Sequence, residues 1–137
     1  MNGVSKKTRR SMLIAAALIL SAAIIWLVLL ESRSYTRAVC RRLEEFGYRL
    51  SPADFYTQGF GADTSISRVV GVDLTEAAEL SRACGFPGDT EKTGLVELML
   101  CRLDGDRVLY VYVVDREPEL VFIEDVSSGT LAPVNGK

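Results

Sequence analysis

The chain has 137 residues, 48% of them apolar, and no histidine, which excludes Ser-His-Asp and Cys-His nucleophiles and imidazole-ligated zinc. Sixteen Lys and Arg stand against eighteen Asp and Glu, a net charge of −2; four of the basic residues lie in residues 1–10, so residues 31–137 carry −6. An acidic region of this kind excludes nucleic acid as a partner, because phosphate contacts need a basic surface.

The first predicted element is a transmembrane helix over residues 11–30, which follows a basic tail of residues 1–10. This stretch has no charged residue, and eleven of its twenty residues are Leu, Ile or Val. With a rise of about 1.5 Å per residue, the helix is about 30 Å long, which matches the hydrocarbon thickness of a bilayer. We therefore expect the lipid bilayer to be a partner through residues 11–30.

A cleaved signal peptide is the main alternative, but its apolar core is shorter and is followed by small residues at the cleavage site. The nearest candidate, Ser32-Arg33-Ser34, contains an arginine, so a retained anchor is favoured. Ala17 and Ser21 form a small-xxx-small pair that suits helix dimerisation, although plain anchoring explains them as well. Four basic residues flank each side of the span, and the 107 residues after it are long enough to be translocated regardless of charge. We expect a cytoplasmic N-terminus and a single extracytoplasmic domain over residues 31–137.

Two helices are predicted in that domain. Apolar residues recur at helical spacing from Ser34 to Phe46, and Gly47 supplies the left-handed residue that ends a helix. We interpret this helix as one that packs its apolar stripe on a sheet; a membrane-proximal stalk is the alternative. The second helix is predicted to begin at Asp73, with Glu76 completing a capping box, and to stop at Gly85.

The remaining pattern is mostly β-type. Residues 48–50 and the β-branched residues 66–72 are predicted as strands, whereas residues 53–63 show no clear period. Three further runs, residues 95–103, 107–115 and 120–124, are predicted as strands, with a hairpin at Asp104-Gly105-Asp106. Glu117-Pro118-Glu119 is interpreted as a solvated link, and the tail from Ser127 as largely irregular. The predicted fold is α+β: an antiparallel meander packed by two helices on one face.

The helix that closes with Phe46-Gly47-Tyr48, the second helix that closes with Gly85-Phe86, the hairpin and the glycine-containing tail together resemble a bacterial family, domain of unknown function 4830. The resemblance covers residues 37–137. Tyr48 stands where that family usually has tryptophan, and the tail lacks a histidine. The resemblance implies a bacterial cell-envelope protein of unassigned function, and it brings no catalytic residue.

Candidate sites are few. Cys40, Cys84 and Cys101 have no C-x-x-C spacing and are interpreted as small core residues; a Cys84–Cys101 disulfide is the alternative. Asp104 and Asp106 form a D-x-D that can hold a divalent cation, but turn geometry explains them and no third ligand is indicated. We expect no metal or other cofactor.

A recognition surface is predicted on the sheet. If the helices cover the face of Leu109, Val111 and Val113, then Tyr110 and Tyr112 lie on the other face, where exposed tyrosines suit a peptide or glycan. Phe60, between two glycines, is a candidate tip of a binding loop; the alternative is that residues 55–60 or the tail fold over the tyrosines.

The function expected from the sequence is that of a membrane-anchored extracytoplasmic interaction or structural module of the envelope, without catalytic residues, whose partner is an envelope protein or peptide. The alternatives are a small envelope enzyme that uses carboxylates or a thiol, and an accessory subunit of a membrane complex.

Overall fold

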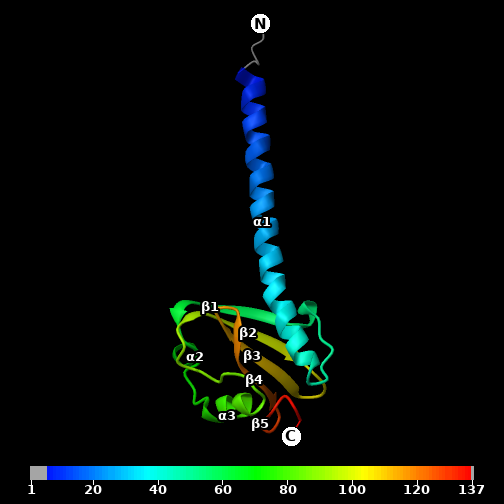
Figure 1. Ribbon diagram of the computed structural model, residues 1–137, viewed down its shortest axis with the longest axis vertical. Coiled ribbons are helices and arrows are strands. Elements are labelled where there is room, and N and C mark those ends of the chain that lie inside the picture. The colour runs from blue at the N-terminus through cyan, green and yellow to red at the C-terminus, as the bar shows by residue number, and fades with distance from the viewer. Residues whose placement is uncertain (1–5, 137) are drawn as a thin grey trace. The chain divides into compact units, whose positions relative to one another are not determined.

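The structure, a computed structural model, describes residues 6–136 and divides into two compact units between Thr36 and Arg37. One continuous helix, α1 (Lys6–Glu44), contributes to both units (Figure 1). It ends as predicted: Gly47 has a φ of +93°, and the Tyr48 amide donates a 3.2 Å hydrogen bond to the Leu43 carbonyl. Gly47 therefore closes the helix in the left-handed conformation that glycine adopts without steric cost.

The first unit is the apolar part of α1. All residues from Lys6 to Leu27 are exposed, and this stretch is long and apolar enough to cross a membrane, a property that a signal sequence near an N-terminus shares. The Ser21 hydroxyl donates a 2.9 Å hydrogen bond to the Ala17 carbonyl, so its polar group is satisfied within the helix. The large side chains on this helix, such as Ile19 at 70% exposure, pack against nothing else in the described chain.

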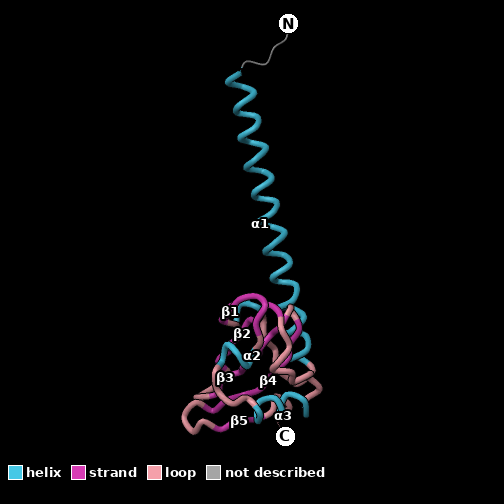
Figure 2. Tube along the Cα trace, turned by 90° about the vertical axis from the view of Figure 1, so that its left-hand side faces the viewer, coloured by secondary structure: helices cyan, strands magenta, loops and turns pink. Residues whose placement is uncertain are grey.

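The second unit, which we call the lobe (Arg37–Lys137), contains a five-stranded antiparallel sheet. Its strands are β1 (Tyr56–Thr64), β2 (Gly94–Arg102), β3 (Arg107–Val114), β4 (Glu117–Asp125) and β5 (Thr130–Ala132), in that spatial order. The helical segments are the end of α1, a 3₁₀ turn η1 (Pro52–Asp54), α2 (Ile66–Val70) and α3 (Thr75–Ala83), as Figure 2 shows by colour. The α+β class, the meander and the three predicted C-terminal strands are confirmed, whereas β1 and β5 were not predicted.

Helices pack on both faces of the sheet, so the expectation of two helices on one face is wrong. On one face, α2 and α3 enclose a core of nine buried residues: Ile66, Ala77, Ala78, Val96, Leu98, Tyr112, Val114, Leu120 and Phe122. The alternate strand residues, including Met99, Val111 and Val121, point to the opposite face and are fully buried. The last turns of α1 bury Val39 and Leu43, and Cys40 lies near Cys101 of β2, which points to the same face as Met99. The first helix therefore packs on the sheet, as predicted.

Residues 66–72 do not form the predicted strand: α2 is a helix that Gly71 ends at a φ of +69°. Ile66, Val69 and Val70 have the i, i+3, i+4 spacing of one helical face, and all three pack in the core. Burial of this face outweighs the preference of β-branched residues for strands. Residues 48–50 also form no strand.

The start of α3 differs in detail from the predicted capping box. The Asp73 carboxylate accepts hydrogen bonds from the Thr75 amide and hydroxyl at 2.9 and 2.6 Å, but the N-cap position belongs to Leu74 and has no side-chain hydrogen bond. Asp73 therefore lies at the beginning of the helix, as predicted, whereas Glu76 does not complete a capping box.

The predicted link at Glu117-Pro118-Glu119 is instead the beginning of β4, and this expectation is wrong. The hairpin turn lies one step earlier, at Asp115 and Arg116, whose φ values are +49° and +67°. Two consecutive left-handed residues form the tight turn whose twist matches paired strands. Tyr112 pairs with Leu120 and Val113 with Pro118, so Glu119 is the extra residue of a bulge.

Candidate functional site

The predicted tyrosine surface is largely covered. Tyr112 is 6% exposed, and its ring lies 6.3 Å from that of Phe122, which in turn stacks on Tyr110 at 5.0 Å. Tyr110, Phe60 and Leu131 are half-buried around this stack. The condition for the recognition surface, that the helices leave the tyrosine face open, is not met, because α2 and α3 lie on it. Ligand contact by Tyr110, Tyr112 and Phe60 stays a prediction. Of these three side chains, Tyr110 and Phe60 are the ones that are partly exposed to solvent.

The environment of Tyr110 also keeps its hydroxyl protonated. Burial and a hydrogen bond to the Glu124 carboxylate raise the pKa of Tyr110 to about 12. Burial, followed by the nearby Glu124 charge, raises the pKa of Tyr112. Both groups therefore remain neutral at physiological pH, as suits structural tyrosines.

The three cysteines are free and buried, as the core interpretation predicts. Burial raises the pKa of Cys40 and of Cys101, and the Asp54 carboxylate raises both further. Cys101 also acts on Cys40, so these two thiols are neighbours between α1 and the sheet. A thiol with a raised pKa is a weak nucleophile at neutral pH, because the thiolate is the reactive form. The Cys84–Cys101 disulfide is not formed in this structure.

Of the two acidic candidates, Asp104 makes a structural contact through its side chain. The Asp104 carboxylate lies 3.1 Å from Nη1 of Arg107, across a turn in which Gly105 has a φ of +53°. Among residues 6–136, no group of three or more His, Cys, Asp or Glu side chains converges on a point where a metal ion could bind.

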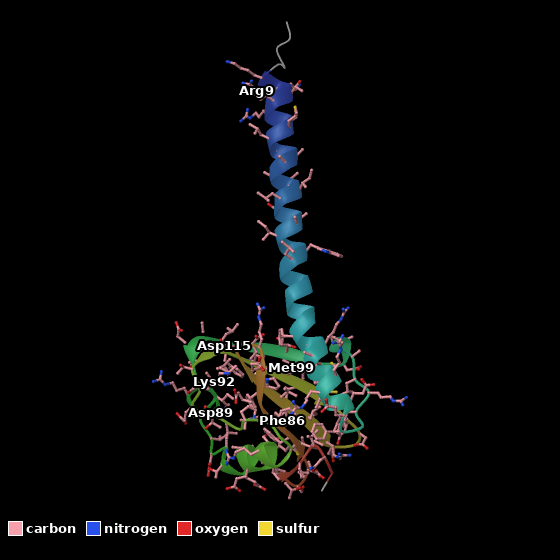
Figure 3. The ribbon with its side chains drawn as sticks, viewed as in Figure 1. Arg9, Phe86, Asp89, Lys92, Met99 and Asp115 are labelled. Carbon is pink, nitrogen blue, oxygen red and sulfur yellow. The ribbon has the colours of Figure 1, made fainter. Side chains whose placement is uncertain are left out.

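Glu119 is the most deeply buried carboxylate of the described chain, and the prediction that it is solvated is wrong; Glu117 is exposed. Its side chain is 3% exposed and lies 3.1 Å from the Lys92 ammonium, while the Asp89 amide donates to its other oxygen at 3.4 Å. Lys92 and Asp89 lie on the same side of the lobe (Figure 3). The bulge in β4 directs this carboxylate inward, which no sequence pattern indicated.

One concave feature of the lobe is a pocket of about 610 Å³, here called the arginine pocket. Its wall combines the last turns of α1 with the loop that leads into η1: Arg37, Cys40, Arg41, Glu44, Tyr48, Arg49, Leu50, Ser51, Pro52 and Asp54. The neighbouring Arg42 is not part of the wall, because its guanidinium lies 4.9 Å from the Phe86 ring centre and donates to the Gly85 carbonyl at 3.1 Å.

Charge in the arginine pocket is distributed unevenly. Arg37, Arg41 and Arg49 make no ion pair or side-chain hydrogen bond with any side chain of residues 35–136, and all three are exposed. The Asp54 carboxylate, in contrast, accepts from the Ser51 amide at 2.8 Å and lies 3.2 Å from the Ser51 hydroxyl. Glu45, which lies one helical turn after Arg41, pairs with Arg42 at 3.7 Å. Three cationic groups are thus left available beside one hydrogen-bonded carboxylate and Glu44.

Sequence reasoning did not identify this pocket. Arg37 and Arg41 lie on the exposed face of α1, whereas Arg49 lies beyond the helix end. Only the turn at Gly47 brings Arg49 back toward the helix, and a turn direction is not readable from residue spacing. Comparison of the chain with protein-family models, curated proteins and solved structures finds no match.

Proposed function

We propose that the protein is a single-pass membrane protein of the bacterial cell envelope, with its N-terminus in the cytoplasm and its lobe outside, and that the lobe is a non-enzymatic interaction or structural module. The observation that carries this proposal is the apolar helix, in which every residue from Lys6 to Leu27 is exposed. In water, Trp26 and Ile19 would leave 64% and 70% of their surface solvated. A bilayer removes that cost, since each buried CH₂ group favours transfer by about 0.8 kcal/mol.

The core of the lobe supports the same assignment. Val39 and Leu43, at the end of α1, are buried in the lobe, whereas the apolar residues up to Leu27 are not needed for its core. A cleavable signal sequence is discarded after export, but here the helix continues without a break into residues that the lobe buries. Retention of the helix as an anchor is therefore the better explanation.

A non-enzymatic role is supported by the state of the reactive groups. The thiols are buried, and burial raises the pKa of two of them. The Ser81 hydroxyl is 0% exposed and bonded to backbone groups, and Glu119 is neutralised by Lys92. The accessible features of the described lobe include its surface charge and the arginine pocket, which are means of binding rather than of bond cleavage.

The test is the location of a C-terminally tagged full-length chain in bacterial cells. We expect the tag in the membrane fraction after alkaline carbonate washing, and we expect external protease to remove it from spheroplasts while a cytoplasmic marker survives. A soluble exported fragment that begins near Ser34 would instead establish a cleaved leader. A tag that protease reaches only after lysis would reverse the proposed orientation.

A further inference from the structure

Basic residues are concentrated where the chain leaves the apolar segment. Residues 31–49 contain five arginines and three glutamates, whereas residues 50–137 contain seven basic and fifteen acidic residues. The lobe is therefore acidic as a whole but cationic over its first stretch. Three of those five arginines, Arg37, Arg41 and Arg49, line the arginine pocket.

The wall of the pocket holds three arginines against two carboxylates, Glu44 and Asp54, so its positive charges are only partly balanced. Arg37 and Arg41 are one helical turn apart, and like charges at this spacing disfavour the helix by a few tenths of a kcal/mol. Two other cations of the lobe have acidic partners: Arg107 pairs with Asp104, and Lys92 pairs with Glu119. An anion between Arg37, Arg41 and Arg49 would relieve the repulsion and supply the missing acceptors.

The shape and chemistry of the wall fit a phosphate group. Guanidinium groups present planar pairs of donors that match phosphate oxygens, and they stay charged at any physiological pH. Tyr48 is also in the wall, where its side chain can contact the carbon atoms of a headgroup. A volume of about 610 Å³ is ample for a phosphate group with a small alcohol attached.

The chain also limits how far the pocket can lie from a membrane. Arg37 is the seventh residue after Leu30, so even a fully extended backbone keeps Arg37 within about 25 Å of the end of the apolar run. Lipid phosphates lie in the interfacial layer that borders the hydrocarbon core.

We propose that the arginine pocket binds a phosphate group, through Arg37, Arg41 and Arg49, and that an anionic phospholipid headgroup presents it. The lipid source rests on the proposed membrane anchoring; the binding of phosphate as such does not. Free phosphate is the other source of the same chemistry, and the experiment separates the two.

The experiment titrates the full-length chain, held in zwitterionic detergent, with two probes: short-chain phosphatidylglycerol and inorganic phosphate. Calorimetry measures the affinity of the chain, of Arg37→Gln, Arg41→Gln and Arg49→Gln, and of Arg68→Gln, which removes an exposed arginine of α2 outside the pocket. We expect each pocket variant to bind phosphatidylglycerol about tenfold more weakly, since hydrogen bonds to charged groups contribute at least that much. Arg68→Gln should bind as the unchanged chain does.

Each outcome decides one point. Pocket-dependent binding of phosphatidylglycerol but not of inorganic phosphate supports the lipid source, and comparable pocket-dependent binding of both supports a phosphate site that a soluble anion fills. Equal affinities for all four variants and the unchanged chain, or no binding of either probe, would overturn the proposal. Thermal unfolding of each variant verifies that the lobe is folded. Because detergent replaces the membrane, failure here is distinguishable from failure of the anchoring proposal, which the tagged chain in cells tests.

Discussion

The Lys92 ammonium lies 3.1 Å from the Glu119 carboxylate, whose side chain is only 3% exposed, and so joins the loop before β2 to the bulge of β4. The same segments are also joined by the backbone, since the Gly88 amide donates a 2.8 Å hydrogen bond to the Glu119 carbonyl. A buried carboxylate that loses its cation is costly, because nothing compensates its desolvation.

We therefore expect Lys92→Met to lower the free energy of unfolding by about 2 kcal/mol, less than for a fully buried pair because Lys92 keeps a third of its side chain in water. Urea unfolding of the full-length chain in detergent measures this value. The variant that combines Lys92→Met with Glu119→Gln should recover part of the loss, since no bare charge remains. A double variant whose loss is the sum of the two single losses would show that the pair is not coupled.

The Ser81 side chain forms hydrogen bonds with the backbone of β4. Its hydroxyl accepts a 2.9 Å hydrogen bond from the Val121 amide and lies 3.1 Å from the Val121 carbonyl, where β5 is too short to pair with β4. We expect Ser81→Ala to cost about 1–3 kcal/mol, because it leaves buried backbone groups unpaired. Amide hydrogen exchange at Val121 should accelerate in this variant. Ser127→Ala, at an exposed turn, is the control and should leave the exchange unchanged.

The tyrosine stack predicts a loss of stability at alkaline pH. The pKa of Tyr110 is about 12 in the folded lobe against about 10 for an unperturbed tyrosine, so folding favours the protonated hydroxyl. This contribution is fully present below pH 10 and is lost as the pH rises from 10 to 12. Phenolate absorbance of the folded lobe should show a tyrosine that ionises near pH 12, and Tyr110→Phe should remove this component. Tyr110→Phe should weaken the fall in urea midpoint over that range, and Tyr56→Phe should not; equal falls in both would contradict the assignment.

The apolar helix predicts how a charge in its middle would act. Leu20 is 63% exposed and lies near the centre of residues 11–30, where an arginine disfavours membrane insertion by about 3 kcal/mol. We expect Leu20→Arg to move a large share of the chain out of the carbonate-resistant membrane fraction. Val126→Arg, at a 57% exposed position of the lobe, adds the same charge and should leave the distribution unchanged. Loss of membrane association in both variants would indicate a nonspecific effect of charge.

The sequence predicted helices and turns correctly where a pattern of neighbouring residues determined the local structure. The twenty uncharged residues before Glu31 predict a long apolar helix, Gly47 predicts its end, and Asp104-Gly105 predicts the hairpin between β2 and β3. Each of these features depends on a short stretch of sequence: a glycine that adopts a left-handed conformation, or an uninterrupted apolar run. Residues that are neighbours in the sequence are therefore enough to predict it.

Tertiary structure decided what depends on segments far apart in the sequence. The side chains of Ile66, Val69 and Val70 suit a strand as well as a helix, and packing against Tyr112 and Leu120 selected the helix. The same packing covered the tyrosine face, and a bulge in β4 turned Glu119 inward. Arg49 joined Arg37 and Arg41 only because the chain reverses after α1. Burial and charge proximity are set by the whole fold, so the spacing of residues along one element could not reveal them.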